Sequence, residues 1–379
     1  MTLVQADPAR YIMIGGFLGA GKSTAIAKLT EYLDKKHFRV GLITNDQGQQ
    51  LVDTLNLRKK GFEVEEIPGG CFCCRFNSLV EAADNLSKAQ RPDLFIAEPV
   101  GSCTDLVASV SYPLRRMYGG QFSIAPLNVL VDPRRAAAIL GLIPGKSFSE
   151  KVVYIYLKQL EEADRIVINK KDLLDPDALV ALQAAIRAKF PEKPLTVISA
   201  RTGEGMDAWF ESLLATEQSA SKTMTLDYRI YAEGEALLGW LNATVNLRSP
   251  SLFDGDAWLE RFARAIQNRL HRQGVEIAHF KMTLEPLDGS GELAVLNLVG
   301  TDFAPELAQS LSDPLDQGQL IVNLRAEGEP EVLEQALKEG LEEVQDPSLR
   351  LDLDHLECFQ PAPPEPVYRM DAFGTHLES

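Results

Sequence analysis

The stretch GGFLGAGKST (Gly15–Thr24) follows the apolar run Tyr11–Ile14 and precedes a segment with helical spacing. It satisfies the pattern G-x-x-x-x-G-K-[ST], whose fixed positions here are Gly16, Gly21, Lys22 and Ser23. A phosphate chain has to approach successive backbone N–H groups at a helix N-terminus, and a Cβ atom at these positions would hold it away. We therefore predict a phosphate-binding loop between a buried strand and a helix. Lys22 would pair with the β- and γ-phosphates, and the Ser23 hydroxyl would bind Mg²⁺.

Apolar segments and helix-like segments alternate along the first 216 residues. The expected strands are 11–15, 39–44, 63–67, 93–98, 127–132, 165–169 and 195–199. The helix-like stretches between them include 75–90, 133–141, 150–163 and 176–189. Near-continuous apolar strands separated by helices predict a mostly parallel sheet covered on both faces, which together with the loop indicates an α/β P-loop NTPase domain.

The order of elements changes after residue 216. A polar linker is expected at 217–226, followed by a smaller C-terminal α+β domain at 227–348, with helices on one face of an antiparallel sheet. Its strands are expected near 235–247, 275–285, 292–300 and 319–326, and its helices near 256–273 and 330–344. The proline-rich segment 349–379 is expected to be a loosely ordered tail.

Composition excludes several classes of protein. The 379 residues carry a net charge of −16, which argues against a nucleic-acid-binding protein because such proteins need a basic face. No apolar run approaches the length of a membrane-spanning helix, and the first residues lack the pattern of a secretory signal. We therefore expect a cytoplasmic protein without membrane contact.

The segment NKKD (Asn169–Asp172) follows a predicted strand late in the sheet. The Asp172 carboxylate can accept two hydrogen bonds from N1 and N2 of guanine, a pair that adenine does not offer. The Asn169 amide and the aliphatic part of Lys170 can frame the ring, and a backbone N–H at Ser199–Ala200 can reach O6. This pattern favours GTP over ATP; the alternative is an ordinary charged loop.

Polar residues after two other strands predict the hydrolytic machinery. Glu98 leaves a buried strand beside the phosphate loop and can hold Mg²⁺ or its water shell, while Gly101 leaves room for the γ-phosphate. Asp46 is a candidate Mg²⁺ ligand, and Gln47 could orient the attacking water. The alternative for Asp46 and Gln47 is a polar turn.

Three of the five cysteines crowd into the segment CFCC, as Cys71, Cys73 and Cys74. Three soft thiolates this close suit Zn²⁺ or a similar thiophilic ion, although no fourth ligand is obvious. The alternative is a structural role in which one cysteine is buried and the other two have no ligand. Cys103 follows Gly101 by two residues and could approach the nucleotide, or it could be a packed small residue.

The order of these motifs resembles the CobW-like GTPases of the SIMIBI class over about residues 10–215. The resemblance implies Mg²⁺-dependent GTP hydrolysis and binding of zinc or another transition metal at Cys71, Cys73 and Cys74. It implies that Glu98 is the Walker-B carboxylate and that Asn169, Lys170 and Asp172 read guanine. It also implies that the segment Gly16–Thr24 holds phosphates, including the residues Gly19, Ala20 and Thr24.

Three functions remain open from the sequence. The first is a GTPase that binds a transition metal, zinc above all, and delivers it to a client metalloprotein or a cofactor pathway, as a monomer or a homodimer. The second is a GTP-driven switch that activates a cofactor enzyme of the corrinoid type without delivering metal. The third is a small-molecule kinase, against which the guanine motif argues.

Overall fold

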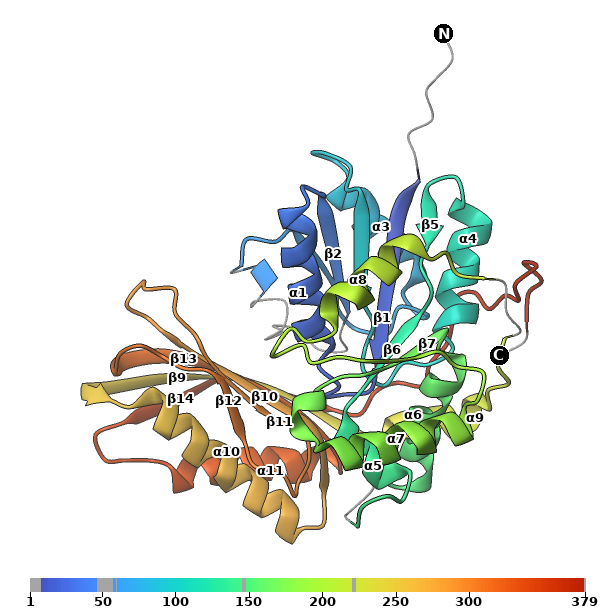
Figure 1. Cartoon of the computed structure of the whole chain (residues 1–379). Helices are drawn as coiled ribbons and strands as arrows, with labels where there is room; N and C mark the ends of the chain where they lie inside the picture. Colours follow the sequence, from blue (N-terminus) through green and yellow to red (C-terminus); the bar gives the residue numbers. More distant parts are fainter. Residues whose placement is uncertain (1–7, 46–56, 59, 145–147, 220–222, 378–379) are drawn as a thin grey trace.

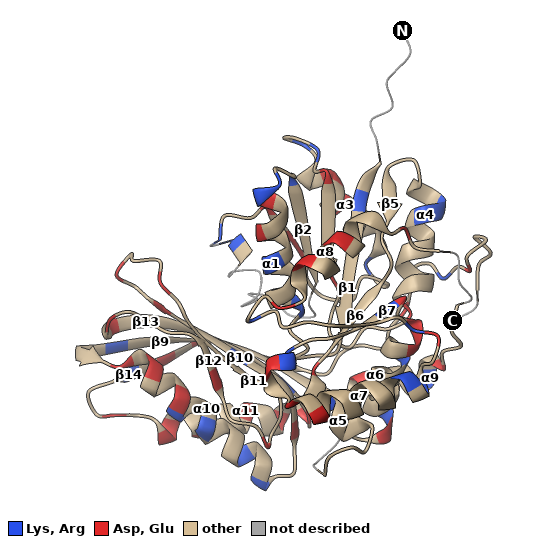
Figure 2. Ribbon diagram, in the orientation of Figure 1, with Lys and Arg blue, Asp and Glu red and all other residues tan. Residues whose placement is uncertain are grey.

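The computed structural model describes residues 8–45, 57–58, 60–144, 148–219 and 223–377. It contains two sheets, one in each half of the chain, and the helices of each half pack against its own sheet (Figure 1). In the described part of the chain, no helix combines the length and the apolar character needed to cross a lipid bilayer. In Figure 2, basic and acidic residues are interspersed along the ribbons of α1 (Lys22–Lys35) and α10 (Gly255–Arg272).

The first sheet has the strand order β3-β2-β4-β1-β6-β7-β8, with β5 also beside β1. All its described strand pairs run parallel. The strands are β1 (Ala9–Gly16), β2 (Val40–Asn45), β3 (Val64–Ile67), β4 (Leu94–Glu98), β5 (Phe122–Ile124), β6 (Asn128–Val131), β7 (Arg165–Ile168) and β8 (Leu195–Val197). Because the strands are parallel, their carboxyl ends meet at one edge, where ligands bind in open α/β sheets.

Helices cover both faces of this sheet, as predicted. Successive side chains of β1 alternate between two separate apolar cores, with Tyr11 and Met13 in one and Ile12 and Ile14 in the other. Besides α1, the helices are α3 (Phe76–Leu86), the π-helical turn Val107–Ser111, α4 (Tyr112–Tyr118), α5 (Pro133–Ile139), α6 (Glu150–Glu162), the 3₁₀ turn Lys171–Leu173, α7 (Pro176–Lys189) and α8 (Met206–Ala215). The predicted parallel α/β architecture is confirmed.

The second sheet is antiparallel, with the strand order β12-β11-β10-β13-β9-β14. Its strands are β9 (Leu238–Phe253), β10 (Glu276–Pro286), β11 (Ala294–Leu298), β12 (Glu306–Gln309), β13 (Leu315–Glu327) and β14 (Arg350–Phe359). Two helices, α10 and α11 (Pro330–Glu343), share one apolar core with this sheet. In β10, Phe280 and Met282 belong to that core, so the intervening Lys281 points to the opposite face.

Two segments differ from the sequence-based expectation. The tail 349–379 was expected to be loosely ordered, but Arg350–Phe359 forms β14 and pairs with β9. The expectation rested on the proline-rich residues that follow this strand, and the short alternation of apolar residues within the strand was not recognised. The second difference is α9 (Tyr228–Ala236), which precedes β9 and packs against α6 of the first half, where a Cβ on Gly234 would stand 2.7 Å from the Lys151 carbonyl oxygen.

Arg135 on α5 joins the two halves of the chain. Its guanidinium is buried and donates to the carbonyl of Leu18 in the phosphate loop. It also donates to the carbonyl of Ala278 in β10, at 2.8 Å, and to that of Val299, which follows β11. It also lies over the rings of Phe17 and Phe148. One side chain therefore fixes the phosphate loop against the second sheet.

Replacing Arg135 with methionine removes the donor from three carbonyl groups, of which those of Leu18 and Ala278 are buried. We expect the free energy of unfolding to fall by roughly 2–4 kcal/mol, since each buried acceptor left unsatisfied costs about 1–3 kcal/mol and some will find water. Chemical denaturation measures the loss. The matched control, Arg187→Met, changes an exposed arginine on α7 and should stay within about 0.5 kcal/mol of the parent. Equal stability of the two variants would contradict this role of Arg135.

Candidate nucleotide and metal site

The phosphate loop runs from the end of β1 to the first turn of α1. Gly21 has a left-handed φ of 87°, and a Cβ there would stand 2.5 Å from the amide nitrogen of Asn169. A Cβ on Gly19 would stand 2.9 Å from a methyl carbon of Val299, which follows β11. The loop is therefore enclosed by the guanine motif on one side and by the second sheet on the other.

Lys22, Ser23 and Glu98 meet at the carboxyl ends of β1 and β4. The Lys22 amine is buried and donates to the Gly16 carbonyl at 2.9 Å, while the Ser23 hydroxyl donates to Glu98 Oε1 at 2.8 Å. A hydroxyl and a carboxylate are the oxygen ligands that Mg²⁺ takes beside nucleotide phosphates. These two residues fit the predicted Mg²⁺ site, whereas Asp46 and Gln47 lie outside the described residues.

The Asn169 side chain links the phosphate loop to the loop that follows β8. Its amide donates to the Ala20 carbonyl at 2.9 Å and accepts from the Ala200 N–H at 3.0 Å. The Ala200 N–H, one of the two backbone N–H groups that were candidates to reach guanine O6, thus donates to Asn169. The Ser199 hydroxyl donates to Asp172 at 2.5 Å and orients the carboxylate that is predicted to read guanine.

The structure adds a residue that the sequence did not indicate, Asp132 at the end of β6. Lys170 donates to its carboxylate at 2.9 Å and to the Gly19 carbonyl at 2.7 Å. Burial raises the pKa of Asp132, but the charges of Lys170 and Arg135 outweigh burial and hold it below the usual value. Asp132 is therefore a buried anion that positions Lys170 over the phosphate loop.

These residues line a cavity of about 630 Å³. The predicted nucleotide residues in its lining are Gly19, Gly21, Lys22, Ser23, Thr24, Glu98, Gly101, Asn169, Lys170, Asp172 and Ala200. Gly16, Ala20 and Ser199 lie behind them as hydrogen-bond partners. A volume of this size is typical of small-molecule sites.

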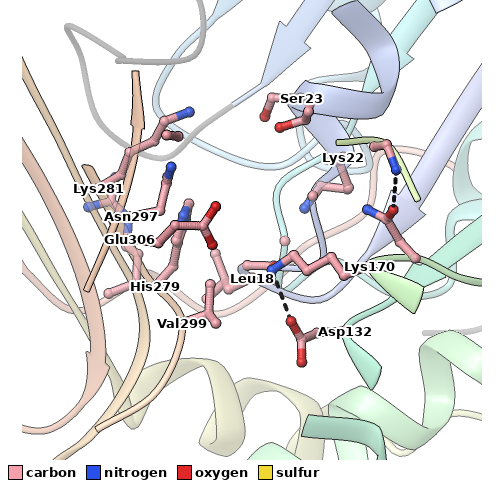
Figure 3. A pocket seen from close by; sticks show the side chains of 18 of the residues that line it. Leu18, Lys22, Ser23, Asp132, Lys170, His279, Lys281, Asn297, Val299 and Glu306 are labelled. Carbon is pink, nitrogen blue, oxygen red and sulfur yellow. Dashed lines mark hydrogen bonds and ion pairs between the residues drawn. The ribbon is translucent and has the colours of Figure 1, made fainter. Parts of the chain in front are cut away.

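The second sheet forms the opposite wall of the same cavity. His279, Lys281, Asn297, Val299 and Glu306 face Lys22 and Lys170 across it (Figure 3). An ion pair between Arg201 and Glu306 crosses the two halves beside Asp172. The sequence could not reveal this wall, although the alternation in β10 was a signal that one face of the second sheet is polar.

The three predicted metal ligands gather in the loop between β3 and α3. Their sulfur atoms are 2.7 Å apart for Cys71 and Cys73, 3.1 Å for Cys71 and Cys74, and 3.6 Å for Cys73 and Cys74. All three separations are shorter than twice the Zn–S distance of about 2.3 Å, so one ion can reach all three sulfurs. The cluster therefore fits a thiophilic ion. Asn45 connects it to the nucleotide cavity, because Asn45 lines that cavity and its amide donates to the Gly70 carbonyl at 2.6 Å.

The C-terminal segment covers this cluster, which the sequence did not predict. The N–H of Val367 donates to the Cys73 carbonyl at 2.9 Å, and the N–H of Glu365 donates to the Cys74 sulfur at 3.2 Å. Arg369 is anchored to the buried Asp105 carboxylate at 2.7 Å. Cys71 and Cys73 are buried in this arrangement, and Cys74 is half-buried.

Residues 10–196 match the family model for the nucleotide-binding domain of CobW/HypB/UreG. The first domain is a CobW/HypB/UreG nucleotide-binding domain. The resemblance inferred from the motif order is thereby confirmed, and with it the assignment to a family of GTPases.

Similar proteins were found by sequence and by structure. The chain is 29% identical over 250 residues to the zinc chaperone CobW of Sinorhizobium sp., covering 58% of this chain and 69% of that protein. It is 30% identical over 177 residues to the zinc chaperone YeiR of Escherichia coli, covering 46% of this chain and only half of that protein. The solved structure of HypB from Helicobacter pylori in complex with nickel overlaps 54% of this chain and 86% of its own, at 20% identity and a TM-score of 0.40.

Changing Asp172 to asparagine tests the guanine reading of the CobW/HypB/UreG domain. The variant loses an acceptor for guanine N1 and N2, so GTP affinity should fall by about 10–100-fold, the value of a hydrogen bond to a charged group. It should gain affinity for xanthosine triphosphate, whose O2 can accept from the new amide. Calorimetric titration measures both constants, with the exposed Asp177→Asn on α7 as the matched control. Unchanged GTP affinity in the Asp172 variant would overturn the assignment.

Arg369→Ala tests whether the C-terminal segment shields the thiols. The variant loses a hydrogen bond to a charged group, which contributes about 1.5–3 kcal/mol. The fraction of molecules in which the C-terminal segment is detached from the cluster should therefore rise by about tenfold or more, and the alkylation rate of Cys74 with it. Mass spectrometry of iodoacetamide-treated protein follows each cysteine separately. Arg350→Ala, which removes an exposed ion pair with Asp352 in the same part of the chain, is the control. A Cys74 rate equal to that of the parent would rule out shielding by this anchor.

Proposed function

We propose that the protein hydrolyses GTP with Mg²⁺ and uses the reaction to bind and release a transition metal, zinc, at Cys71, Cys73 and Cys74. The observation that carries the proposal is the short connection between the two sites. The Asn45 amide donates to the carbonyl of Gly70, next to Cys71, and Asn45 also lines the nucleotide cavity. A change at the phosphates can therefore reach the thiols through a single hydrogen bond.

Each part of the hydrolytic step has a residue at hand. Lys22 brings a buried positive charge to the phosphates, where it offsets the charge that builds up during phosphoryl transfer. Ser23 and Glu98 would hold Mg²⁺, which would neutralise part of the negative charge of the phosphates. Asp46 stays a prediction as a further ligand of Mg²⁺ or of its water, and Gln47 as the residue that orients the attacking water.

A second connection runs along the chain after β4. Gly101 lies against the phosphate loop, since a Cβ on it would stand 2.9 Å from the Leu18 nitrogen. The Gln159 amide donates to the Gly101 carbonyl at 2.9 Å and to the Cys103 carbonyl at 2.8 Å. A displacement of Gly101 by the γ-phosphate would therefore be carried to Cys103, which belongs to the same apolar core as Cys71 and Cys73. Loops that contact the γ-phosphate and are released on hydrolysis couple the nucleotide to distant sites in other GTPases.

Two relatives are zinc chaperones, which supports zinc as the metal and delivery as the purpose of binding it. The thiol set supports the same choice, because soft sulfur ligands select thiophilic ions. The client would be a metalloprotein or a cofactor enzyme. The alternative, a GTP-driven switch without metal delivery, predicts that the cysteines matter only for packing.

Cys73→Ser separates the two functions. If the thiols bind zinc, zinc affinity measured by competition with a chromophoric chelator should fall by about tenfold or more, since even a residue behind a metal ligand contributes that much. GTP hydrolysis by the metal-free variant should continue. Cys358→Ser, which changes a cysteine in β14, should leave zinc affinity unaltered. Unchanged zinc affinity in the Cys73 variant would favour the switch.

A further inference from the structure

The face of the second sheet that α10 and α11 leave uncovered carries a row of polar side chains. Phe280 and Met282 of β10 belong to the core under the helices, so Lys281 between them points to the uncovered face. Lys281 is paired directly with Asn297 of β11 and with Asn323 of β13. Side chains of directly paired residues lie on the same face of a sheet. These three residues therefore form one row across three strands, called the polar row below.

The polar row lines the cavity that contains the phosphate loop. Lys281 is only 9% exposed although its amine is charged, and Asn297 is half-buried. Figure 3 shows both of them across the cavity from Lys22 and Ser23. A cation at a buried position attracts an anion more strongly than one on the surface, because less water screens the two charges.

Contacts near the start of β10 fix the polar row relative to the phosphate loop. A Cβ on Gly19 would stand 2.9 Å from a methyl carbon of Val299 and 3.3 Å from the Ala278 carbonyl oxygen, so the sheet touches the loop there. Lys281 lies three residues after Ala278, which places its Cα about 10 Å farther along the strand at about 3.4 Å per residue. Asn297 lies beside it on β11. The polar row thus faces the loop across the cavity instead of packing against it.

We propose that Lys281 and Asn297 bind the terminal phosphate of GTP from the side opposite Lys22, so that the second half of the chain distinguishes GTP from GDP. The inference rests on the GTP-hydrolysing part of the proposed function and not on metal binding. Backbone N–H groups of a phosphate loop surround the inner phosphates, which leaves the terminal phosphate to face the opposite wall. Amines and amides donate to phosphate oxygens, and such charge-assisted hydrogen bonds are strong.

Asn323, the third member of the polar row, has a different role. Its amide donates to Asn242 Oδ1 of β9 at 3.0 Å and to the Val322 carbonyl at 3.1 Å. Both of its N–H donors are therefore used within the sheet. Asn323 fixes the polar row to the neighbouring strand, and the donors assigned to the phosphate are those of Lys281 and Asn297.

The test compares two nucleotides on the full chain. Calorimetric titration with Mg²⁺ measures the affinity for a non-hydrolysable GTP analogue and for GDP. Lys281→Met keeps the apolar stem and removes the amine, so the analogue should bind about 10–100-fold more weakly while GDP affinity stays within about twofold. Lys281→Arg, which keeps a charged donor, should recover most of the affinity for the analogue. Asn297→Ala should weaken binding of the analogue by about tenfold and leave GDP affinity unchanged.

Two controls match these changes in charge and in residue type. Lys338→Met removes an exposed amine of α11 that pairs with Glu334. Asn246→Ala changes a half-buried asparagine of β9 on the same uncovered face, which is not among the residues that line the cavity. Both controls should keep the parent's ratio of analogue affinity to GDP affinity. If Lys281→Met does not fold, Asn297→Ala decides the question, because it removes no buried charge.

The possible failures are distinguishable. A parent-like ratio of the two affinities in Lys281→Met and Asn297→Ala, or an equal loss for both nucleotides, would overturn this role of the second sheet and leave the proposed function standing. A parent protein that does not bind the GTP analogue would overturn the proposed function itself.

Discussion

The turn between Glu98 and Asp105 is the constraint on which the two sites depend. It begins at the carboxylate that accepts from Ser23 and ends at Asp105, a buried non-glycine residue with a left-handed φ of 64°. Such a backbone conformation persists only when its surroundings enforce it, and here the Asp105 carboxylate accepts from Tyr228 and Arg369 at 2.7 Å each. Because both ends are fixed, a ligand pressing on the middle of the turn must move the residues between them.

The second half of the chain takes part in the first half's chemistry instead of being a separate module. The polar face of its sheet closes the nucleotide cavity, and Arg135 secures the phosphate loop to the backbone beside β10 and β11. Its last residues return across the molecule to cover Cys73 and Cys74. We therefore expect a change in nucleotide binding to affect both the access of metal to the thiols and the packing of the two sheets.

The sequence predicted what is encoded locally. The phosphate loop, the guanine motif and the three clustered thiols are contiguous segments whose residue types dictate their chemistry, and the alternation of strands and helices predicted the parallel sheet. Arg135 and Asp132 were missed because they act on backbone groups and a lysine distant in the chain. The covering segment was misjudged because a proline-rich composition says nothing about docking. For Cys103 the sequence left open a contact with the nucleotide or a packed small residue, and only the fold shows that it is buried in the apolar core that also holds Cys71 and Cys73.

The central claim is that the terminal phosphate and the thiol set share one equilibrium, and linkage requires each ligand to change the other's affinity by the same factor. The most direct measurement is zinc affinity by chelator competition in the same preparation with a non-hydrolysable GTP analogue and with GDP. The account predicts tighter zinc binding with the analogue by about 5–150-fold, the usual span of allosteric coupling. Equal zinc affinity with the two nucleotides would contradict it.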